Sequence, residues 1–232
     1  MAKFIKTGSC IDCSCQVSLF SCMTKEQLEL VDKNRNQVVF KPGETIFKTG
    51  SPLTHILCLT GGMVKIYLED PSSGKNILLS ISKPIEMIGG PGFLVDDRHY
   101  ITVVALEETT ACFVRVEDYK DVIFNNPEFS LELIKSRNER IIKYFNKMLH
   151  LTYKQTHGKI ADTLLYLSDE IYNSDTYYTP LTRQDMADMS SITKDSAIRV
   201  LKEFVSEGII KCGLHDFEIL NKELLKKISK TG

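Results

Sequence analysis

The sequence has no tryptophan and no long apolar run. No segment reaches the roughly 18 consecutive apolar residues that a membrane-spanning helix needs. The first nine residues carry no apolar signal core, so we expect a cytoplasmic protein. Neither sign of charge is in excess, because 29 Lys and Arg balance 30 Asp and Glu. This balance excludes a basic-tail nucleic-acid binder, but it leaves room for a local basic surface.

Motifs typical of enzymes are missing as well. The sequence has no P-loop, no HExxH and no nucleophile–base arrangement, and its five His are scattered. We therefore expect no enzymatic activity. Seven cysteines, an odd number in a chain without an export signal, argue against a structural disulfide framework. Cys58 and Cys112 lie in apolar runs and are expected to be small buried hydrophobes.

Residues 36–116 show the pattern of a β domain. Short apolar runs such as 38–40, 56–59 and 63–67 alternate with turn residues such as Gly61-Gly62 and Pro71-Ser72-Ser73-Gly74. Strands at a spacing of roughly 8–12 residues with Gly and Pro between them predict a barrel or sandwich. A short helix is expected before it, from Thr24 to Asn34, with Thr24 as a possible N-cap.

A long helix is expected from Pro127 onward, because proline is favoured at the first helical position. Its apolar residues recur at spacings of seven, four and three, which indicates a coiled-coil seam with one polar member. The expected seam consists of Ile134, Asn138, Ile141, Phe145 and Met148. Such a helix can pack on its own β domain, but a seam this regular is at least as well explained by pairing with a second copy.

Residues 181–210 predict a helix-turn-helix. Thr182 is an N-cap candidate with Asp185 at its third position, and Thr193 is a second N-cap candidate after a Ser-rich turn. The second helix should bury Ala197, Val200, Leu201, Phe204 and Val205. Its other side should expose polar and charged residues, as a recognition helix does. An ordinary helical hairpin remains the alternative at this point.

The order of these elements resembles the Crp/Fnr family of bacterial transcription regulators over nearly the whole chain. Residues 41–81 look like the family's cyclic-nucleotide-binding-type β-roll, and residues 157–168 look like the first helix of its DNA-binding domain. Residues 183–202, RQDMADMSSITKDSAIRVLK, match its recognition motif without a gap. The resemblance implies an α+β fold: an N-terminal β-roll that is double-stranded and jelly-roll-like, a long dimerisation helix and a C-terminal winged helix-turn-helix.

The effector expected from the resemblance is not cAMP. Family members that bind cAMP have a Glu after the turn glycine and an Arg-Ser pair at the next strand, where this chain has Gly90 and Tyr100-Ile101. The polar pair on their long helix is replaced here by Tyr144-Phe145. A buried cyclic phosphate needs a cation or several N–H donors. The candidate effector-pocket residues are Gly89, Gly90, Tyr100, Ile101, Tyr144 and Phe145.

Cysteines crowd the first 22 residues. Another branch of the family senses oxygen through an iron–sulfur cluster held by N-terminal cysteines and one cysteine before the long helix. The resemblance gives Cys10, Cys13, Cys15 and Cys112 as candidate metal ligands, since a cluster needs four thiolates. Three interpretations stay open here: a disordered or loosely packed Cys-bearing arm, a cluster site, and a zinc or thiol–disulfide switch.

The sequence thus predicts a homodimeric, sequence-specific DNA-binding regulator that acts on pseudo-palindromic double-stranded operators. Base reading is expected from Lys194, Asp195 and Arg199, and phosphate contacts from Thr182, Arg183, Ser196 and Lys202. RNA polymerase is expected as a further partner. The alternative function is a redox or oxygen sensor whose output is a protein contact. The expected domains are an arm at 1–23, a sensor at 24–126, a dimerisation helix and hinge at 127–153, and the DNA-binding domain at 154–232.

Overall fold

The computed structural model describes residues 3–5, 9–13, 18–70 and 72–232. The chain forms two compact units. One comprises Met1–Pro71 and Ser80–Ile141, and the other comprises Ser72–Leu79 and Ile142–Gly232. No helix among the described residues is long and apolar enough to cross a membrane.

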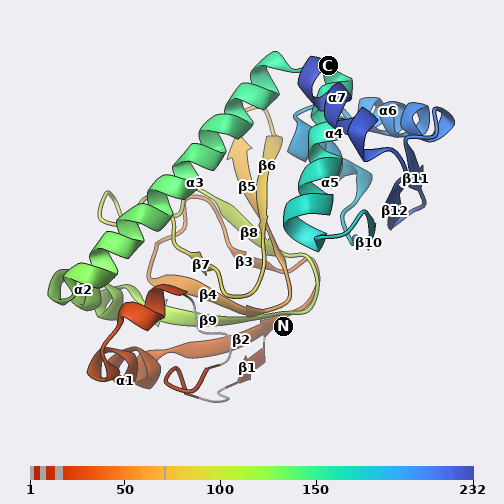
Figure 1. Cartoon of the computed structure of the whole chain (residues 1–232). Helices are drawn as coiled ribbons and strands as arrows, with labels where there is room; N and C mark the ends of the chain where they lie inside the picture. Colours follow the sequence, from red (N-terminus) through yellow and green to blue (C-terminus); the bar gives the residue numbers. More distant parts are fainter. Residues whose placement is uncertain (1–2, 6–8, 14–17, 71) are drawn as a thin grey trace. The chain divides into compact units, whose positions relative to one another are not determined.

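Two sheets make up the β-rich part of the molecule (Figure 1). The first has the order β1-β2-β9-β4-β7, with β1 at Lys3–Ile5, β2 at Asn36–Phe40, β9 at Thr109–Arg115, β4 at His55–Gly61 and β7 at Met87–Ile88. The second has the order β3-β8-β5-β6, with β3 at Thr45–Phe47, β8 at Thr102–Ala105, β5 at Val64–Asp70 and β6 at Lys75–Ser82. The predicted α+β fold with its β-roll is confirmed.

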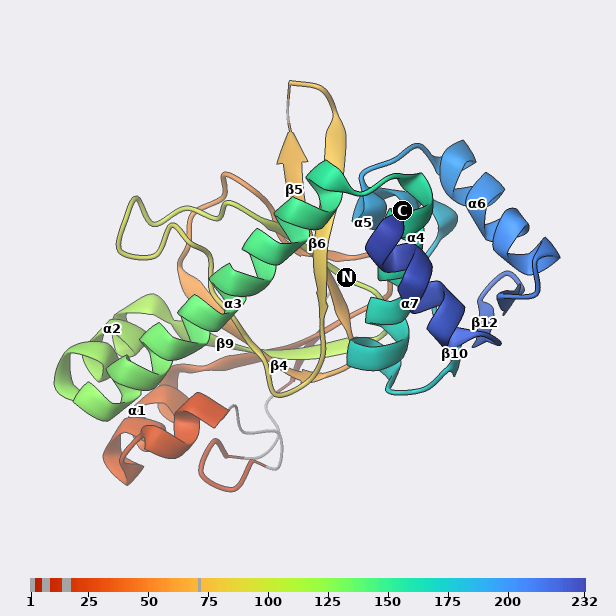
Figure 2. The ribbon, with the colours of Figure 1, turned by 45° about the horizontal axis from the view of Figure 1, so that its top comes forward.

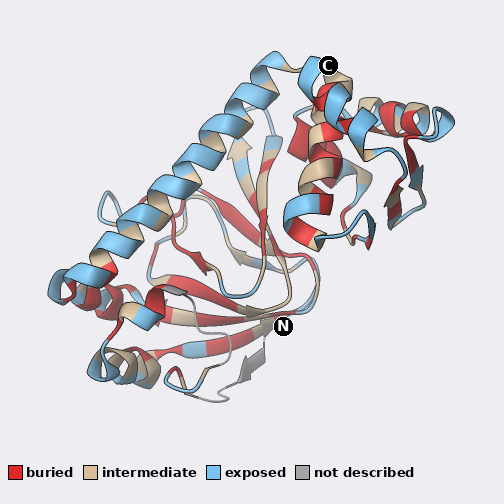
Figure 3. Ribbon diagram, viewed as in Figure 1, coloured by how far each residue is buried: buried red, intermediate tan, exposed pale blue. Residues whose placement is uncertain are grey.

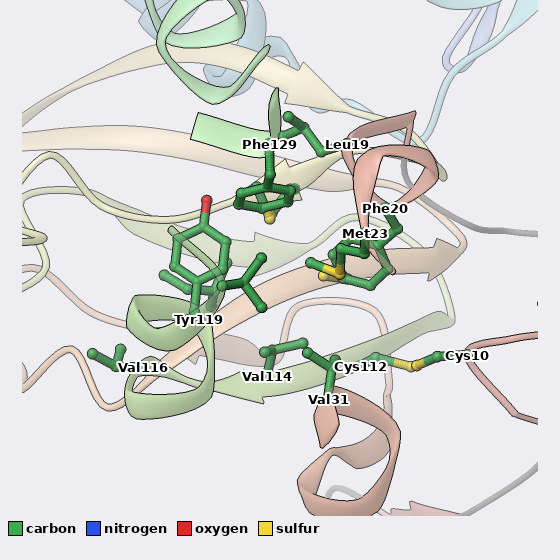
Figure 4. Packing of buried hydrophobic residues seen from close by; sticks show 14 of the residues in the cluster. Cys10, Leu19, Phe20, Met23, Val31, Cys112, Val114, Val116, Tyr119 and Phe129 are labelled. Carbon is green, nitrogen blue, oxygen red and sulfur yellow. The ribbon is translucent and has the colours of Figure 1, made fainter. Parts of the chain in front are cut away.

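Three helical segments and β4 and β9 enclose one apolar core (Figure 4). The short 3-10 helix Ser18–Cys22 leads into α1 (Lys25–Asn34), and α2 (Val116–Asn125) follows β9. The predicted cap of α1 is present, because Thr24 accepts from the Gln27 N–H and the Gln27 side chain accepts from the Thr24 N–H. Tyr119 and Phe129 lie edge to face in the core, with ring centroids 5.7 Å apart. Edge-to-face aromatic pairs are a favoured geometry.

The long helix α3 spans Pro127–Tyr153. Pro127 is its first residue, as predicted. Figure 3 shows that most of this helix is exposed, and only Phe129 is classed as buried along it.

The C-terminal part is mainly helical. It contains α4 (Thr156–Tyr166), a π-helical turn (Leu167–Tyr172), α5 (Arg183–Ser190), α6 (Lys194–Ser206) and α7 (Lys222–Thr231). A small sheet has the order β10-β12-β11, formed by β10 (Thr176–Tyr178), β12 (Asp216–Ile219) and β11 (Ile210–Cys212). Figure 2 shows α7 beside α4. Their contact is close enough that a Cβ on Gly158 would lie 2.6 Å from the Gly232 carbonyl oxygen.

A strained turn precedes β7. Ile85 has a φ of +74°, a left-handed conformation that costs a side chain with a Cβ about 1–2 kcal/mol. Two backbone hydrogen bonds of 2.9 Å hold this turn: Ile85 N–H donates to the Leu59 carbonyl, and Leu59 N–H donates to the Glu86 carbonyl. The Ile85 side chain is 49% exposed, so its packing offsets little of the strain.

We predict that Ile85→Gly stabilises the protein by about 0.5 kcal/mol, because the relief of about 1–2 kcal/mol of backbone strain exceeds the roughly 0.5–1 kcal/mol that the extra freedom of glycine in the unfolded chain costs. Denaturant unfolding at neutral pH measures the difference. Val95→Gly is the matched control: Val95 is exposed and β-branched, and its φ is not positive. That control should lose stability, and a similar loss in Ile85→Gly would contradict the strain argument.

Candidate nucleic-acid interface

The first helix of the interface, α5, begins at a capping box. The Thr182 hydroxyl accepts from the Asp185 N–H, and Asp185 Oδ2 accepts from the Thr182 N–H at 2.8 Å. This reciprocal pair satisfies two backbone donors that a helix start otherwise leaves free. The helix ends at Ser191, which adopts a left-handed conformation (φ +49°) and turns the chain toward α6.

The rotation of α6 is set by its buried side. Ala197, Val200, Leu201 and Phe204 are buried, as predicted. Val205 was predicted to share this side, and that prediction is wrong, because its side chain is 43% exposed. At about 100° per residue, Val205 follows Phe204 around the helix toward solvent, while Val200 and Leu201 already span the buried stripe.

The opposite side of α6 is polar and open to solvent. Asp195, Arg199 and Lys202 are exposed there, and Ser196 is half-buried. Lys194 is exposed as the first residue of the helix. Thr193 caps the helix: its hydroxyl accepts from the Ser196 N–H at 3.2 Å and donates to Ser196 Oγ at 2.8 Å. The Ser196 hydroxyl is therefore engaged in the cap of its own helix.

Arg183 joins α5 to the β11–β12 hairpin. Its guanidinium donates to the Gly213 carbonyl and to Cys212 Sγ, the latter at 3.1 Å, and lies 5.0 Å from the centre of the Phe217 ring. Sequence reasoning selected Arg183 only as a phosphate contact and missed this role. The contact partners lie about 30 positions along the chain, so no local pattern could have indicated them.

Comparison with known proteins identifies both parts of the chain. Residues 37–126 match the cyclic nucleotide-binding domain family, and residues 158–228 match the Crp-like helix-turn-helix domain family. The chain belongs to the Crp/Fnr family of transcription regulators. Members of this family are regulators with a DNA-binding helix-turn-helix, not enzymes.

Relatives match over most of their length. The transcriptional regulatory protein btr of Bordetella pertussis is 23% identical, over 88% of this chain and 84% of its own. The transcriptional activator protein anr of Pseudomonas aeruginosa is also 23% identical, over 95% and 94%. The solved structure of FixK2 from Bradyrhizobium japonicum has a TM-score of 0.76 at 17% identity, covering 85% of this chain and 98% of that protein, which shows the shared fold.

The expected effector residues of the β-rich unit lie around a glycine turn. Gly89, Gly90 and Ile101 are buried, whereas Tyr100 is exposed and donates from its hydroxyl to Asp96 at 2.7 Å. Tyr144 and Phe145 belong to the other unit. Two arginines of the β-rich unit donate to backbone carbonyls: Arg98 to Gly50 at 2.8 Å, and Arg137 to Gly89 at 3.1 Å. Sequence reasoning missed Arg137, which comes from α3.

Two of the candidate cysteine ligands are packed into the protein. Cys10 and Cys112 are buried in the same apolar core, so a loosely packed arm does not describe Cys10 (Figure 4). Burial raises the pKa of the Cys10 thiol to about 12 and also raises that of Cys112. Cys13 is half-buried, and Cys15 lies outside the described residues.

The three described candidate thiols, Cys10, Cys13 and Cys112, do not form a metal site as they lie. Among the residues with described positions, no three His, Cys, Asp or Glu side chains come together as a metal site. Instead, Arg35 binds the Cys112 sulfur, with Nη1 3.5 Å from Sγ. The Arg35 Nε donates to Asp32 at 2.8 Å, and the same Asp32 oxygen accepts from the Cys10 N–H at 2.9 Å. The pair of Arg35 and Asp32 thus ties Cys10 to the core.

We predict that Asp32→Asn destabilises the protein by about 2 kcal/mol, because it removes the carboxylate charge that the buried Arg35 binds at 2.8 Å. Burial alone would raise the pKa of Asp32, but hydrogen bonds from Arg35 and the Cys10 N–H outweigh it and lower that pKa. The stabilisation is therefore present above the unfolded-state pKa of about 4 and is lost as the pH falls through the lower folded-state value.

Denaturant unfolding of the wild type and Asp32→Asn between pH 7 and pH 3 tests this. The difference between their free energies of unfolding should become smaller only below about pH 4. Asp12→Asn removes an exposed carboxylate and should stay within about 0.5 kcal/mol of the wild type. Equal stability of the Asp32→Asn and Asp12→Asn variants would show that the Arg35 pair contributes nothing.

Proposed function

We propose that the protein is a homodimeric, sequence-specific transcription regulator that reads operator DNA in the major groove with α6. The observation that carries this proposal is the division of α6 into a buried side and an exposed side that presents Asp195, Arg199 and Lys202, with Lys194 exposed at the start of the helix. Arg can bind guanine through two hydrogen bonds, and Asp can accept from cytosine N4. Lys202 lies about two turns from the start of the helix, where it suits a phosphate contact.

The regulator acts where chromosomal DNA is, which places it in the cytoplasm. As a dimer it presents two recognition helices to half-sites one helical turn, about 34 Å, apart, so the operator is a pseudo-palindrome. RNA polymerase is the proposed protein partner at the promoter. Family membership supports these statements, together with the name of one relative as a transcriptional activator.

We predict that Arg199→Ala leaves folding intact. The Arg199 side chain is exposed, so the substitution removes no contact in the core. The substitution should weaken the free energy of binding to the cognate duplex by about 1–3 kcal/mol and relax the base preference at one base pair per half-site. Lys202→Ala is its counterpart: it should weaken binding to all sequences alike and lower the salt slope by about one. Titration of selected and scrambled duplexes at several salt concentrations measures both. If Arg199→Ala kept the wild-type ratio of affinities for the selected and scrambled duplexes, Arg199 would not be a base-reading residue.

The dimer proposal rests on the apolar face of α3. The predicted seam residues are all exposed in the single chain: Ile134, Asn138, Ile141, Phe145 and Met148. Further large apolar residues that sequence reasoning did not select are exposed on the same helix: Leu131, Ile142, Leu149 and Tyr153. A run of apolar side chains this long on a monomer's surface is typical of an interaction site. The 3–4 spacing suits a second copy of α3.

We predict that Ile141→Glu prevents dimerisation, because two unpaired charges at the interface cost several kcal/mol, of order 3 or more. Light scattering with an in-line size-exclusion column measures the mass. Ser136→Glu adds the same charge to α3 on the side away from the exposed apolar residues, about 220° around the helix from Ile141, and should leave the dimer intact. A dimer of Ile141→Glu at micromolar concentration would argue against pairing through α3.

We further propose that the effector is not cAMP bound in the manner of the family. Tyr100 and Ile101 stand where a cation is needed, and Arg98 is bound to the Gly50 carbonyl. Calorimetric titration with cAMP at physiological concentration should therefore give no heat of binding. Tight binding, with a thermal shift that follows ligand linkage, would show that the phosphate site lies elsewhere in the β-roll.

A further inference from the structure

Glu203 on α6 connects this helix to α4. One carboxylate oxygen, Oε2, lies 2.6 Å from Nε2 of His157, which is in the first turn of α4. The other oxygen, Oε1, lies 3.6 Å from Nη1 of Arg199, one helical turn earlier on α6. One carboxylate oxygen thus contacts a residue of α4, and the other contacts a residue of α6 itself.

The side of this bridge that faces α4 is anchored. The His157 ring packs near Phe204, with ring centroids 5.9 Å apart, and Phe204 is fully buried. Glu203 directly precedes Phe204, so its backbone is fixed by that buried neighbour. Arg199, in contrast, is 62% exposed, and among the described residues Glu203 is the acidic group recorded in an ion pair with it.

This arrangement bears on how Arg199 reads a base. An exposed arginine loses rotamer freedom when it binds, and holding it beforehand improves affinity for the matching partner about two- to tenfold. A carboxylate 3.6 Å from Arg199 also repels phosphates that approach this arginine, which opposes binding of non-matching DNA. Both effects raise the ratio of specific to non-specific affinity.

We propose that Glu203 is a specificity-determining residue: His157 holds its carboxylate, and the carboxylate positions Arg199. The proposal rests on the proposed function, in which Arg199 contacts a base. Glu203 is a positioning residue in this scheme, since it acts through Arg199.

The test uses the full-length protein, a duplex selected by the wild type from a random pool, and its scrambled counterpart. Glu203→Gln should lower the ratio of the two affinities about two- to tenfold, with tighter binding of the scrambled duplex. Glu207→Gln is the matched control. It removes one exposed acidic charge at the end of α6, and no ion pair with Arg199 or His157 is recorded for it. Equal changes of the ratio in the two variants would overturn the proposal, because they would reflect net charge alone.

A double-mutant cycle makes the mechanism falsifiable. In an Arg199→Ala background, Glu203→Gln should no longer change the base preference. His157→Ala should lower the ratio as Glu203→Gln does, and His157→Gln, which keeps a hydrogen-bond donor, should restore part of it. Thermal unfolding of each variant verifies that it is folded. If His157→Ala does not fold, the comparison is made with His157→Gln.

The outcomes separate this proposal from the one it rests on. A wild-type ratio near one, or a normal ratio in Arg199→Ala, overturns the base-reading function and the role of Glu203 with it. A normal wild-type ratio that Arg199→Ala abolishes and Glu203→Gln leaves unchanged overturns only the role of Glu203.

Discussion

The burial of one side of α6 is the constraint on which the proposed DNA-facing surface depends. Val200, Leu201 and Phe204 leave the helix little freedom to rotate, because turning it would expose them and bury charged side chains. The positions of Lys194 and Arg199 follow from that packing and not from any interaction of their own. The caps at Thr182 and Thr193 then decide where each helix begins.

The long helix α3 also has an apolar side, but this side is not buried within one chain. Its apolar residues recur with helical spacing as they do in α6, but within one chain they remain exposed, including Ile134, Phe145 and Met148. Exposed apolar area costs free energy in proportion to its size, about 25 cal/mol per Å². A second copy of the helix removes that area from water on both chains at once, and this supports dimerisation through α3.

Local patterns accounted for most of the architecture. The capped start of α1 at Thr24, the β-rich region and the paired helices at 183–206 were all predictable, since spacing and capping act over a few residues. The failures involve contacts distant in sequence. Arg183 reaches Gly213, and Cys10 is held through Asp32. Val205 is a different case: it is apolar, but it lies one residue beyond the stripe that the core accepts.

The two halves of the chain differ in how closely they follow their family. Helix α6 has the buried and exposed sides expected of the family's recognition helix. In the β-roll, Gly90, Tyr100 and Ile101 stand where the resemblance leads us to expect the residues that hold a cyclic phosphate. Arg98 and Arg137 come near the glycine turn, but each donates to a backbone carbonyl, Gly50 or Gly89. A ligand that took either guanidinium would have to replace that hydrogen bond, which offsets part of the energy of a charge-assisted contact. These differences support the proposal that the protein binds DNA as its family does but responds to an effector other than cAMP.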